Sequence, residues 1–220
     1  MRKNAVNINL PLLICLFLVG LTGVFGQQTT FGLIGGINAA QIKSPSGLHD
    51  ILWRYNAGMT VERRFSPSIA IVGELIYTRQ GEIVNEESYT PATGTIHDKQ
   101  VITFDYLALP LMIRVRPKGE RVFIELGGQA GVMIHNYFRI TSDPTSGTAY
   151  DYTNKLDAGL TGGIGYRLGK HFVLDARYYH GMRPILSEFT AIDPQTGMPT
   201  TFHLVRWYNR IYSLNLSYFF

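Results

Sequence analysis

The chain has very little cysteine: Cys15 is its single one among 220 residues, and it lies in an apolar N-terminal segment. Two basic residues precede this segment, which runs from Leu10 to Phe25, and that order is typical of a secretory signal peptide. The segment is shorter than the roughly 20 apolar residues that a spanning helix needs. A lipoprotein signal would place its cysteine at the cleavage point. We therefore expect residues 1–26 to be a cleaved signal and residues 27–220 to form one domain without disulfides, thiolate catalysis or cysteine metal sites.

The chain also lacks a strong excess of one charge and, after the signal, any apolar run of helix length. It has 20 Lys and Arg residues against 16 Asp and Glu residues, a formal charge of +4. Removing Arg2 and Lys3 with the signal leaves 18 against 16, or +2. This weak surplus gives no support for nucleic-acid binding. Without a helix-length apolar run, a membrane location would have to depend on strands.

What the sequence does contain is alternation at a period of two, which predicts strands with one apolar face. The segment Arg210–Phe220 shows this well, because every second residue from Tyr212 to Phe220 is apolar or aromatic. The residues between them, Ser213, Asn215 and Ser217, are small and polar. Eight such strands are predicted: Phe31–Ala40, Asn56–Phe65, Ile69–Gln80, Thr103–Arg116, Phe123–Phe138, Leu156–Leu168, Phe172–Met182 and a last one from about Val205 to Phe220.

The links between these strands alternate in length. Short turns are expected at Ser66–Ser68, Pro117–Glu120 and Gly169–Lys170. Long polar links are expected at Gln41–Tyr55, Gly81–Ile102, Arg139–Lys155 and Arg183–Leu204. The chain is therefore predicted to be an all-β protein: an eight-stranded antiparallel up-and-down transmembrane β-barrel with short periplasmic turns and long extracellular loops.

Charged residues fall mainly on the polar faces of the predicted strands, which indicates that the apolar faces contact lipid. A charge at the middle of the bilayer would cost about 2–4 kcal/mol in a barrel. Exceptions such as Arg63 and Arg210 lie near strand ends. The predicted interior charge network contains Glu62, Arg64, Glu74, Arg114, Glu125, Asp157, Arg167, Asp175 and Arg177. These acids and bases are nearly balanced, so ion pairs are expected rather than a field that selects one ion.

Aromatic residues near strand ends predict two interfacial belts. The alternative is that tyrosine and phenylalanine simply favour strands. The predicted turn-side belt contains Phe31, Phe65, Tyr166, Phe172, Tyr218 and Phe220, and the loop-side belt contains Tyr77, Tyr137, Phe138, Tyr178, Trp207 and Tyr208.

Five segments in order resemble the Bacteroidetes outer-membrane β-barrel proteins known as the "porin family", or PorT-like proteins. They are Phe31–Asn38, Gly73–Gly81, Tyr106–Leu111, Glu125–Gly131 and Leu174–Tyr178. Ala108 and Leu109 depart slightly from the family's Tyr-Leu-x-Ile-Pro-Leu segment. The resemblance implies an outer-membrane barrel of a Gram-negative bacterium. PorT itself is linked with protein secretion, so a role in a secretion machinery is one alternative function. By resemblance to outer-membrane proteins, Tyr218 and Phe220 are expected to form the signal recognised by the barrel-assembly machinery.

An eight-stranded barrel is just wide enough to be filled by its own side chains. The bulky inward residues Tyr106, Met112, Arg114, Arg177 and Tyr179 therefore predict a closed interior. The leading hypothesis is a non-enzymatic barrel, without a cofactor or metal, whose extracellular loops serve binding or adhesion or whose body supports the envelope. Its expected partners are outer-membrane lipid, lipopolysaccharide and the barrel-assembly machinery, with no nucleic acid.

Two alternatives remain at this point. An enzyme acting on lipid A or peptides at the outer rim could use His180 with Ser187, or the pairs His97–Asp98 and His49–Asp50, although no nucleophile and base are fixed by sequence. A soluble lipocalin-like barrel would need apolar residues inside and charges outside, the reverse of the pattern here.

Overall fold

The computed structural model describes residues 28–43, 49–90, 94–117, 120–140, 154–185, 188–192, 199–203 and 206–220. Within these ranges there is no helix long and apolar enough to cross a membrane. The predicted signal, residues 1–26, lies outside the described residues. The strands are β1 (Thr29–Lys43), β2 (His49–Asp50), β3 (Leu52–Arg64), β4 (Ile69–Thr90), β5 (Gly94–Val115), β6 (Val122–Ile140), β7 (Leu156–Leu168), β8 (Phe172–Gly181), β9 (Glu188–Ile192), β10 (Pro199–His203) and β11 (Tyr208–Phe219).

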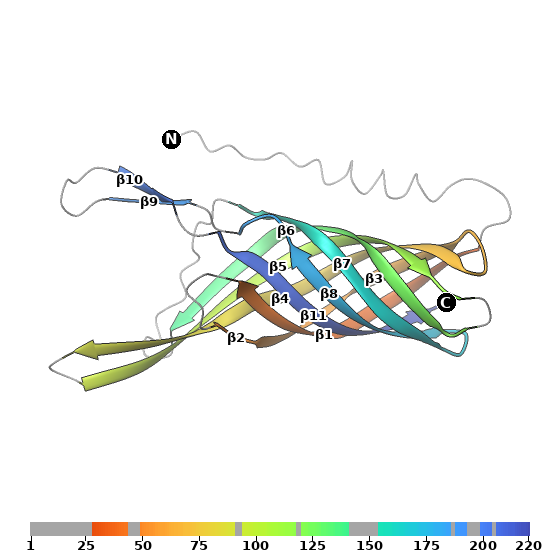
Figure 1. Cartoon of the computed structure of the whole chain (residues 1–220), viewed down its shortest axis with the longest axis horizontal. Coiled ribbons are helices and arrows are strands. Elements are labelled where there is room, and N and C mark those ends of the chain that lie inside the picture. The colour runs from red at the N-terminus through yellow and green to blue at the C-terminus, as the bar shows by residue number, and fades with distance from the viewer. Residues whose placement is uncertain are drawn as a thin grey trace.

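Eight of these strands form a closed antiparallel barrel, as the alternation predicts (Figure 1). The order around the barrel is β4-β3-β1-β11-β8-β7-β6-β5, and pairing of β5 with β4 closes it. First and last strands are neighbours, with Gly32 opposite Phe219. The two-residue β2 adds to the loop-side part of β4, and β9 with β10 forms a separate hairpin.

The register fixes the stagger of the barrel. Following direct partners around the sheet from Phe31 leads through Val61, Gly73, Leu111, Gly128, Leu160, His180 and Arg210, and returns to β1 at Gln41, ten residues further on. Eight strands with this stagger, a rise of ~3.3 Å per residue and a separation of ~4.8 Å require a tilt of about 40°. The backbone then lies ~8 Å from the axis. The barrel is therefore narrow enough for side chains from opposite walls to meet near its axis.

Short connections gather at one end of the barrel and long ones at the other, as predicted. At Ser66–Ser68 the Ser66 hydroxyl accepts the Ile69 N–H at 3.0 Å, and the Phe65 N–H donates to the Ile69 carbonyl. Gly169 has a φ of +68°, which the tight turn between β7 and β8 requires. The remaining predicted turn, Pro117–Glu120, includes residues 118–119, which lie outside the described residues. The chain ends at this turn side (Figure 1).

Three of the predicted long links contain strands: β2 lies within Gln41–Tyr55, and two other links form hairpins. β4 and β5 continue pairing as far as Thr90 opposite Gly94, so most of Gly81–Ile102 is a hairpin that projects beyond the barrel (Figure 1). The predicted link Arg183–Leu204 contains the β9–β10 hairpin. Neither has a barrel wall on one side, so neither needs an apolar face. Without that face, the period-two signal disappears although the strands remain.

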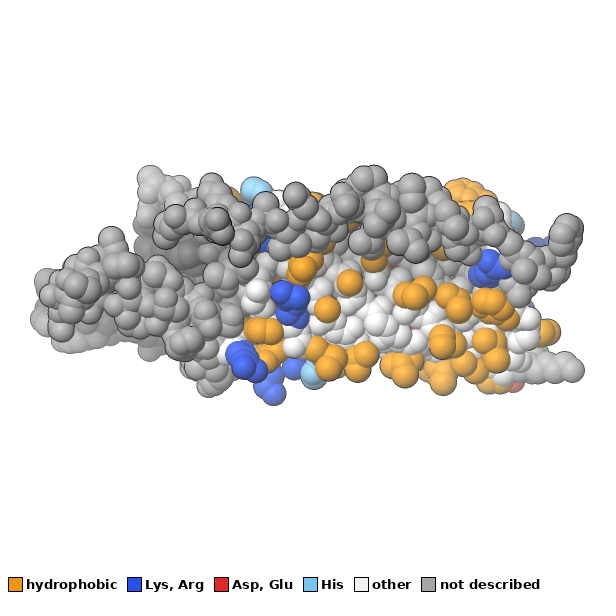
Figure 2. Space-filling view, turned by 90° about the horizontal axis from the view of Figure 1, so that it is seen from above, with side chains coloured by type: hydrophobic (Ala, Val, Ile, Leu, Met, Phe, Trp, Pro, Cys, Tyr) orange, Lys and Arg blue, Asp and Glu red, His pale blue; other side chains and the backbone are white. Residues whose placement is uncertain are grey.

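The two faces of the barrel wall carry opposite chemistry. Large hydrophobic side chains are exposed on the outside, among them Leu33, Leu111, Leu126, Ile164 and Leu216. Figure 2 shows hydrophobic side chains along the flank, with Lys and Arg gathered toward the ends. This distribution suits lipid contact and is the reverse of a soluble lipocalin-like barrel.

Candidate functional site

The interior is the part of the molecule where charged side chains converge. Of the nine residues of the predicted charge network, eight are buried inside the barrel and Arg64 is half-buried at its turn-side end. The bulky side chains of Tyr106, Met112 and Tyr179 are buried with them. The register pairs Arg114 directly with Glu125, whereas most of the other ion pairs connect strands that are not neighbours.

At the turn side, several arginines surround the carboxylate of Glu62. Arg114 Nη1 lies 2.6 Å from Glu62 Oε2, Arg167 Nη2 lies 2.8 Å from Oε1, and Arg64 Nε lies 2.6 Å from Oε1. Arg114 and Arg167 come from β5 and β7, so their contacts with Glu62 on β3 cross the lumen. Arg114 also lies 4.0 Å from the centroid of the Phe123 ring, which fills space beside it.

Toward the middle of the barrel the ratio of arginines to carboxylates is reversed, because Arg177 is surrounded by three carboxylates. It donates two hydrogen bonds to Glu74, from Nη1 at 2.6 Å and Nη2 at 2.9 Å. Its Nε lies 2.6 Å from Glu125 and 2.7 Å from Asp175. Because Glu125 also accepts from Arg114, the clusters around Glu62 and Arg177 form one network. Charges are nearly balanced within it, as buried ions require.

A chain of amides continues the network, and sequence analysis missed it. Asn215 donates to Asp175 at 2.8 Å, and Asn56 donates to both Asn215 and Asn38. Asn38 then donates to the Thr78 hydroxyl at 2.8 Å. Next to these groups is a cavity of about 20 Å³, which is room for about one water molecule. The signal for this chain was present in the sequence, because each asparagine lies at an inward position of its strand.

Asp157 is buried but is not linked to the main network by a contact in the described part of the chain. It lies nearer the loops, where Asn209 donates to it at 2.7 Å. The prediction of one interior network therefore covers eight residues that the contacts connect and a ninth, Asp157, that sits apart.

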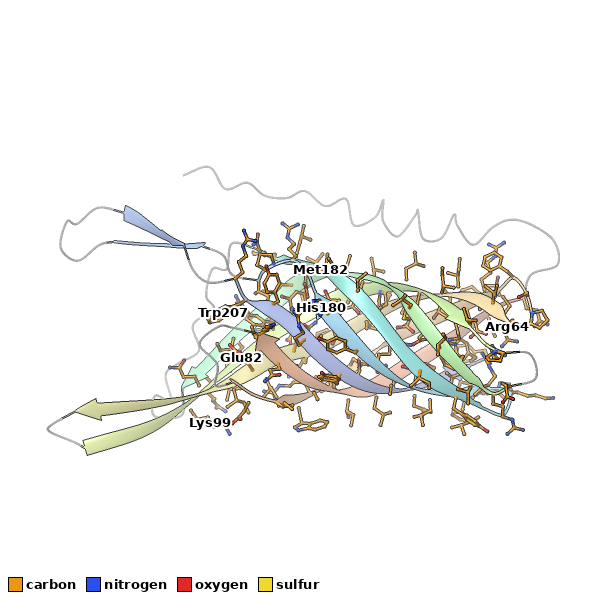
Figure 3. The ribbon with its side chains drawn as sticks, viewed as in Figure 1. Arg64, Glu82, Lys99, His180, Met182 and Trp207 are labelled. Atoms are coloured by element: carbon orange, nitrogen blue, oxygen red, sulfur yellow. The ribbon has the colours of Figure 1, made fainter. Side chains whose placement is uncertain are left out.

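An apolar cluster fills the loop-side end of the lumen. It consists of Ile42, Ile102, Phe104, Tyr106, Met133 and Ile185, with Trp207 packed against it. We call this cluster the cap. Glu82 is fully buried near the cap, and its backbone partner is Ile102. It lies three residues closer to the loops than Arg79, and therefore outside the part of the wall that contacts the hydrocarbon of the membrane. Burial raises the pKa of the Glu82 carboxyl to about 8. In Figure 3, Glu82 and Trp207 lie at the loop-side end and Arg64 at the opposite end.

The exterior carries aromatic residues at both ends, with some corrections to the predicted belts. All six predicted turn-side aromatics are exposed, including Tyr218 and Phe220. On the loop side, Trp207 packs against the cap and does not belong to the belt. The most exposed aromatics there are Trp53 and Tyr212, which sequence analysis missed. The side chain of Phe138 lies outside the described residues.

An outward ion pair near this belt was also missed. Arg79 and Asp105 are direct partners on β4 and β5, joined by two hydrogen bonds of 2.8 and 3.2 Å. The Arg79 guanidinium lies 5.8 Å from the centroid of the Tyr55 ring. Both charges are thereby neutralised where the barrel wall meets the headgroup region. Isolated charges on an apolar face are difficult to pair before the register is known.

Within the described ranges of the chain, no nucleophile and base are brought together by the catalytic candidates. His180 faces outward, and its Nδ1 lies 3.3 Å from the Tyr178 hydroxyl. Ser187 and the side chains of His49, His97 and Asp98 lie outside the described residues. Among the residues that the structure describes, no group of three or more His, Cys, Asp or Glu residues could hold a metal ion.

Comparisons with known proteins identify a family and several similar solved structures. The family described as "Outer membrane protein beta-barrel domain" matches residues 25–187. Among solved structures, Neisserial surface protein A is similar over 88% of this chain and 99% of its own, at 12% identity and a TM-score of 0.50. Ail, the attachment invasion locus protein of Yersinia pestis, covers the same shares at 13% identity and a TM-score of 0.47. OprG from Pseudomonas aeruginosa covers 88% of this chain and 95% of its own, at 12% identity and a TM-score of 0.41.

No curated protein sequence matches the chain. The family match extends over more than half of the residues, and the closed eight-stranded barrel with its apolar exterior is the structure that such a domain requires. This chain belongs to the outer membrane protein beta-barrel domain family and is a small barrel protein of the bacterial outer membrane.

Proposed function

We propose that this protein is a non-enzymatic barrel with a closed transmembrane body that presents extracellular elements for binding or adhesion. The observation that carries the proposal is the filling of the lumen. Ion pairs cross it between β4 and β8 and between β3, β5 and β7, and the cap fills its loop-side end. A solute or ion would have to break several buried ion pairs to pass, at about 3–5 kcal/mol for each one.

The β4–β5 hairpin is the element that we propose to make the contact. Beyond Val84 and Gln100, where the pairing with β2 and β6 ends, it continues for six paired residues on each strand, from Asn85 opposite Lys99 to Thr90 opposite Gly94. A projecting hairpin of this kind has main-chain N–H and C=O groups along its edges, which can pair with an extended segment of another protein.

A loop-shortened variant tests this role. Replacing residues 85–99 with Asn-Gly keeps Val84 opposite Gln100 and supplies the preferred two-residue turn. Cells displaying this variant should lose retention on immobilised matrix proteins and polysaccharides, while the barrel still assembles. Equal retention of variant and parent would refute a binding role for the hairpin.

Planar-bilayer recording of the full-length barrel tests the closed body separately. We expect no steady conductance under an applied potential. Large, stable conductance steps would overturn the proposal, because they require an open lumen.

Several finer proposals rest on sequence features: the five segments that resemble PorT-like proteins, the basic and apolar N-terminal residues, and the aromatic residues of the last strand. We infer that the chain comes from a Bacteroidetes species, that residues 1–26 are removed on export, and that the assembly machinery recognises Tyr218 and Phe220. Lipopolysaccharide is the proposed lipid partner. A role in a secretion machinery is the second candidate function, favoured by the same segments. A deletion strain that retains normal secretion would exclude that second function.

A further inference from the structure

The outer wall of the barrel contains a shallow apolar groove of about 490 Å³. It crosses β3, β1, β11, β8 and β7 in two rows of direct strand partners. The row nearer the loops is Trp53, Ala39, Tyr212, Tyr178 and Gly162, and the other is Ile37, Leu214, Ala176 and Ile164. The groove exists because these rows place the small residues Ala39, Gly162 and Ala176 beside much larger ones. Its volume lies within the range of about 300–1,000 Å³ that is typical of small-molecule sites.

Two basic residues, Arg210 and His180, border the groove on its loop side. Arg210 lies two residues from Tyr212 on β11, and its direct partner on β8 is His180. Their row continues with Gln41 on β1 and Leu160 on β7, so it contains no acid. Arg210 Nη1 donates to the carbonyls of Gly181 and Asn209 at 2.9 and 3.0 Å. These two bonds hold the guanidinium at the surface beside His180.

Arg210 differs from Arg79, another outward arginine on the loop side. Arg79 has its positive charge neutralised by Asp105. In the described part of the chain no ion pair involves Arg210, so its charge lacks a protein counter-ion there. A cation that borders an apolar surface at headgroup level is complementary to an anionic lipid.

We propose that this groove binds one molecule of phosphorylated lipid A, the glycolipid anchor of lipopolysaccharide. An acyl chain lies along the small residues, and a phosphate contacts Arg210 and His180. The exposed faces of Trp53 and Tyr212 pack against the sugar rings. The groove lies in the loop-side half of the barrel, and long loops are extracellular in such barrels. The lipid that reaches it is therefore that of the outer leaflet, which is lipid A. This inference deepens the lipopolysaccharide contact proposed above and is independent of adhesion by the hairpin.

Native mass spectrometry of the detergent-solubilised full chain tests the proposal. The probes are bisphosphorylated lipid A, its dephosphorylated form and phosphatidylglycerol. We expect one retained lipid A per barrel and little retention of the other two. Ala176→Leu should fill the groove and lower retention about tenfold, because it displaces roughly two buried methylene groups of the ligand. Ala130→Leu makes the same change on the exposed outer face of β6 and should have no effect.

Arg210→Gln should lower retention about fivefold, since one cation near an anionic lipid surface contributes that much. Arg121→Gln is the matched control, because Arg121 is exposed at the turn-side end of β6. Equal losses in Ala176→Leu and Ala130→Leu, or equal retention of phosphatidylglycerol and lipid A, would overturn the proposal. The variant with the shortened hairpin should still retain lipid A, which separates failure of this site from failure of the proposed adhesion.

Discussion

Arg177 is the side chain on which the interior network depends most, and Arg177→Met should show this. The substitution keeps much of the side-chain volume but removes the cation that contacts Glu74, Glu125 and Asp175. Glu125 keeps its bond from Arg114, so two of the three carboxylates lose their ion-pair partner. Removing one partner of a buried ion pair costs about 3–5 kcal/mol because the remaining charge stays desolvated. We therefore expect the free energy of unfolding to fall by an amount in that range, or slightly above it.

The assay is reversible urea unfolding of the refolded barrel in lipid vesicles. Both tryptophans report on it, because Trp53 faces outward and Trp207 packs against the cap. At a slope of about 2–3 kcal/mol per molar urea, the midpoint should fall by roughly 1–2 M. Arg206→Met, at an exposed position, is the matched control and should shift stability by less than about 0.5 kcal/mol.

A double-mutant cycle separates the ion pair from the loss of packing. Glu74→Gln removes the carboxylate that accepts two bonds from Arg177. Combined with Arg177→Met, it should cost less than the sum of the two single changes, by about 0.5–3 kcal/mol. A loss below about 1 kcal/mol for Arg177→Met, or strict additivity in the cycle, would refute the view that these contacts hold the interior together.

Three further predictions concern other parts of the barrel. The raised pKa of Glu82 means that the folded state keeps the proton of this carboxyl up to about pH 8, whereas the unfolded chain loses it at lower pH. The free energy of unfolding should therefore fall as pH rises from about 5 to 9. Glu82→Gln should flatten this pH dependence of the urea midpoint. Gly127→Ala should lower stability by about 1–3 kcal/mol, because a Cβ there would overlap the Leu111 carbonyl oxygen. Gly128→Ala is its control: the nearest atom to its Cβ is 3.8 Å away, so the same unfolding assay should show no loss. Deleting Phe220 should reduce the amount of folded barrel in outer-membrane fractions, and unchanged assembly would contradict the proposed signal.

The sequence predicted the architecture well because a barrel wall separates two media. Each of the eight strands has lipid on one face and packed polar side chains on the other, so alternation appeared in every one. The signal was lost wherever that separation ended. The outer half of the β4–β5 hairpin was expected to be a loop because neither face of it borders the barrel interior.

The interior charge network was likewise predictable from the sequence only in part. Inward position follows from the period of two in each strand, and from the sequence alone it placed Glu62, Glu74, Arg114, Glu125 and Arg177 inside. Which of these side chains meet could not be predicted, because Arg177 and Glu74 come from strands on opposite sides of the lumen, 103 residues apart.

By itself, then, the sequence determined that eight strands border an apolar medium and that their charges face away from it. The physical reason is local: a charge in lipid is costly, so each strand must sort its own residues. Only the tertiary structure decided that ion pairs and the cap fill the lumen, and that small residues on β1, β7 and β8 leave an outer groove beside larger ones. Those features depend on the ten-residue stagger, which brings together side chains from strands far apart in the chain.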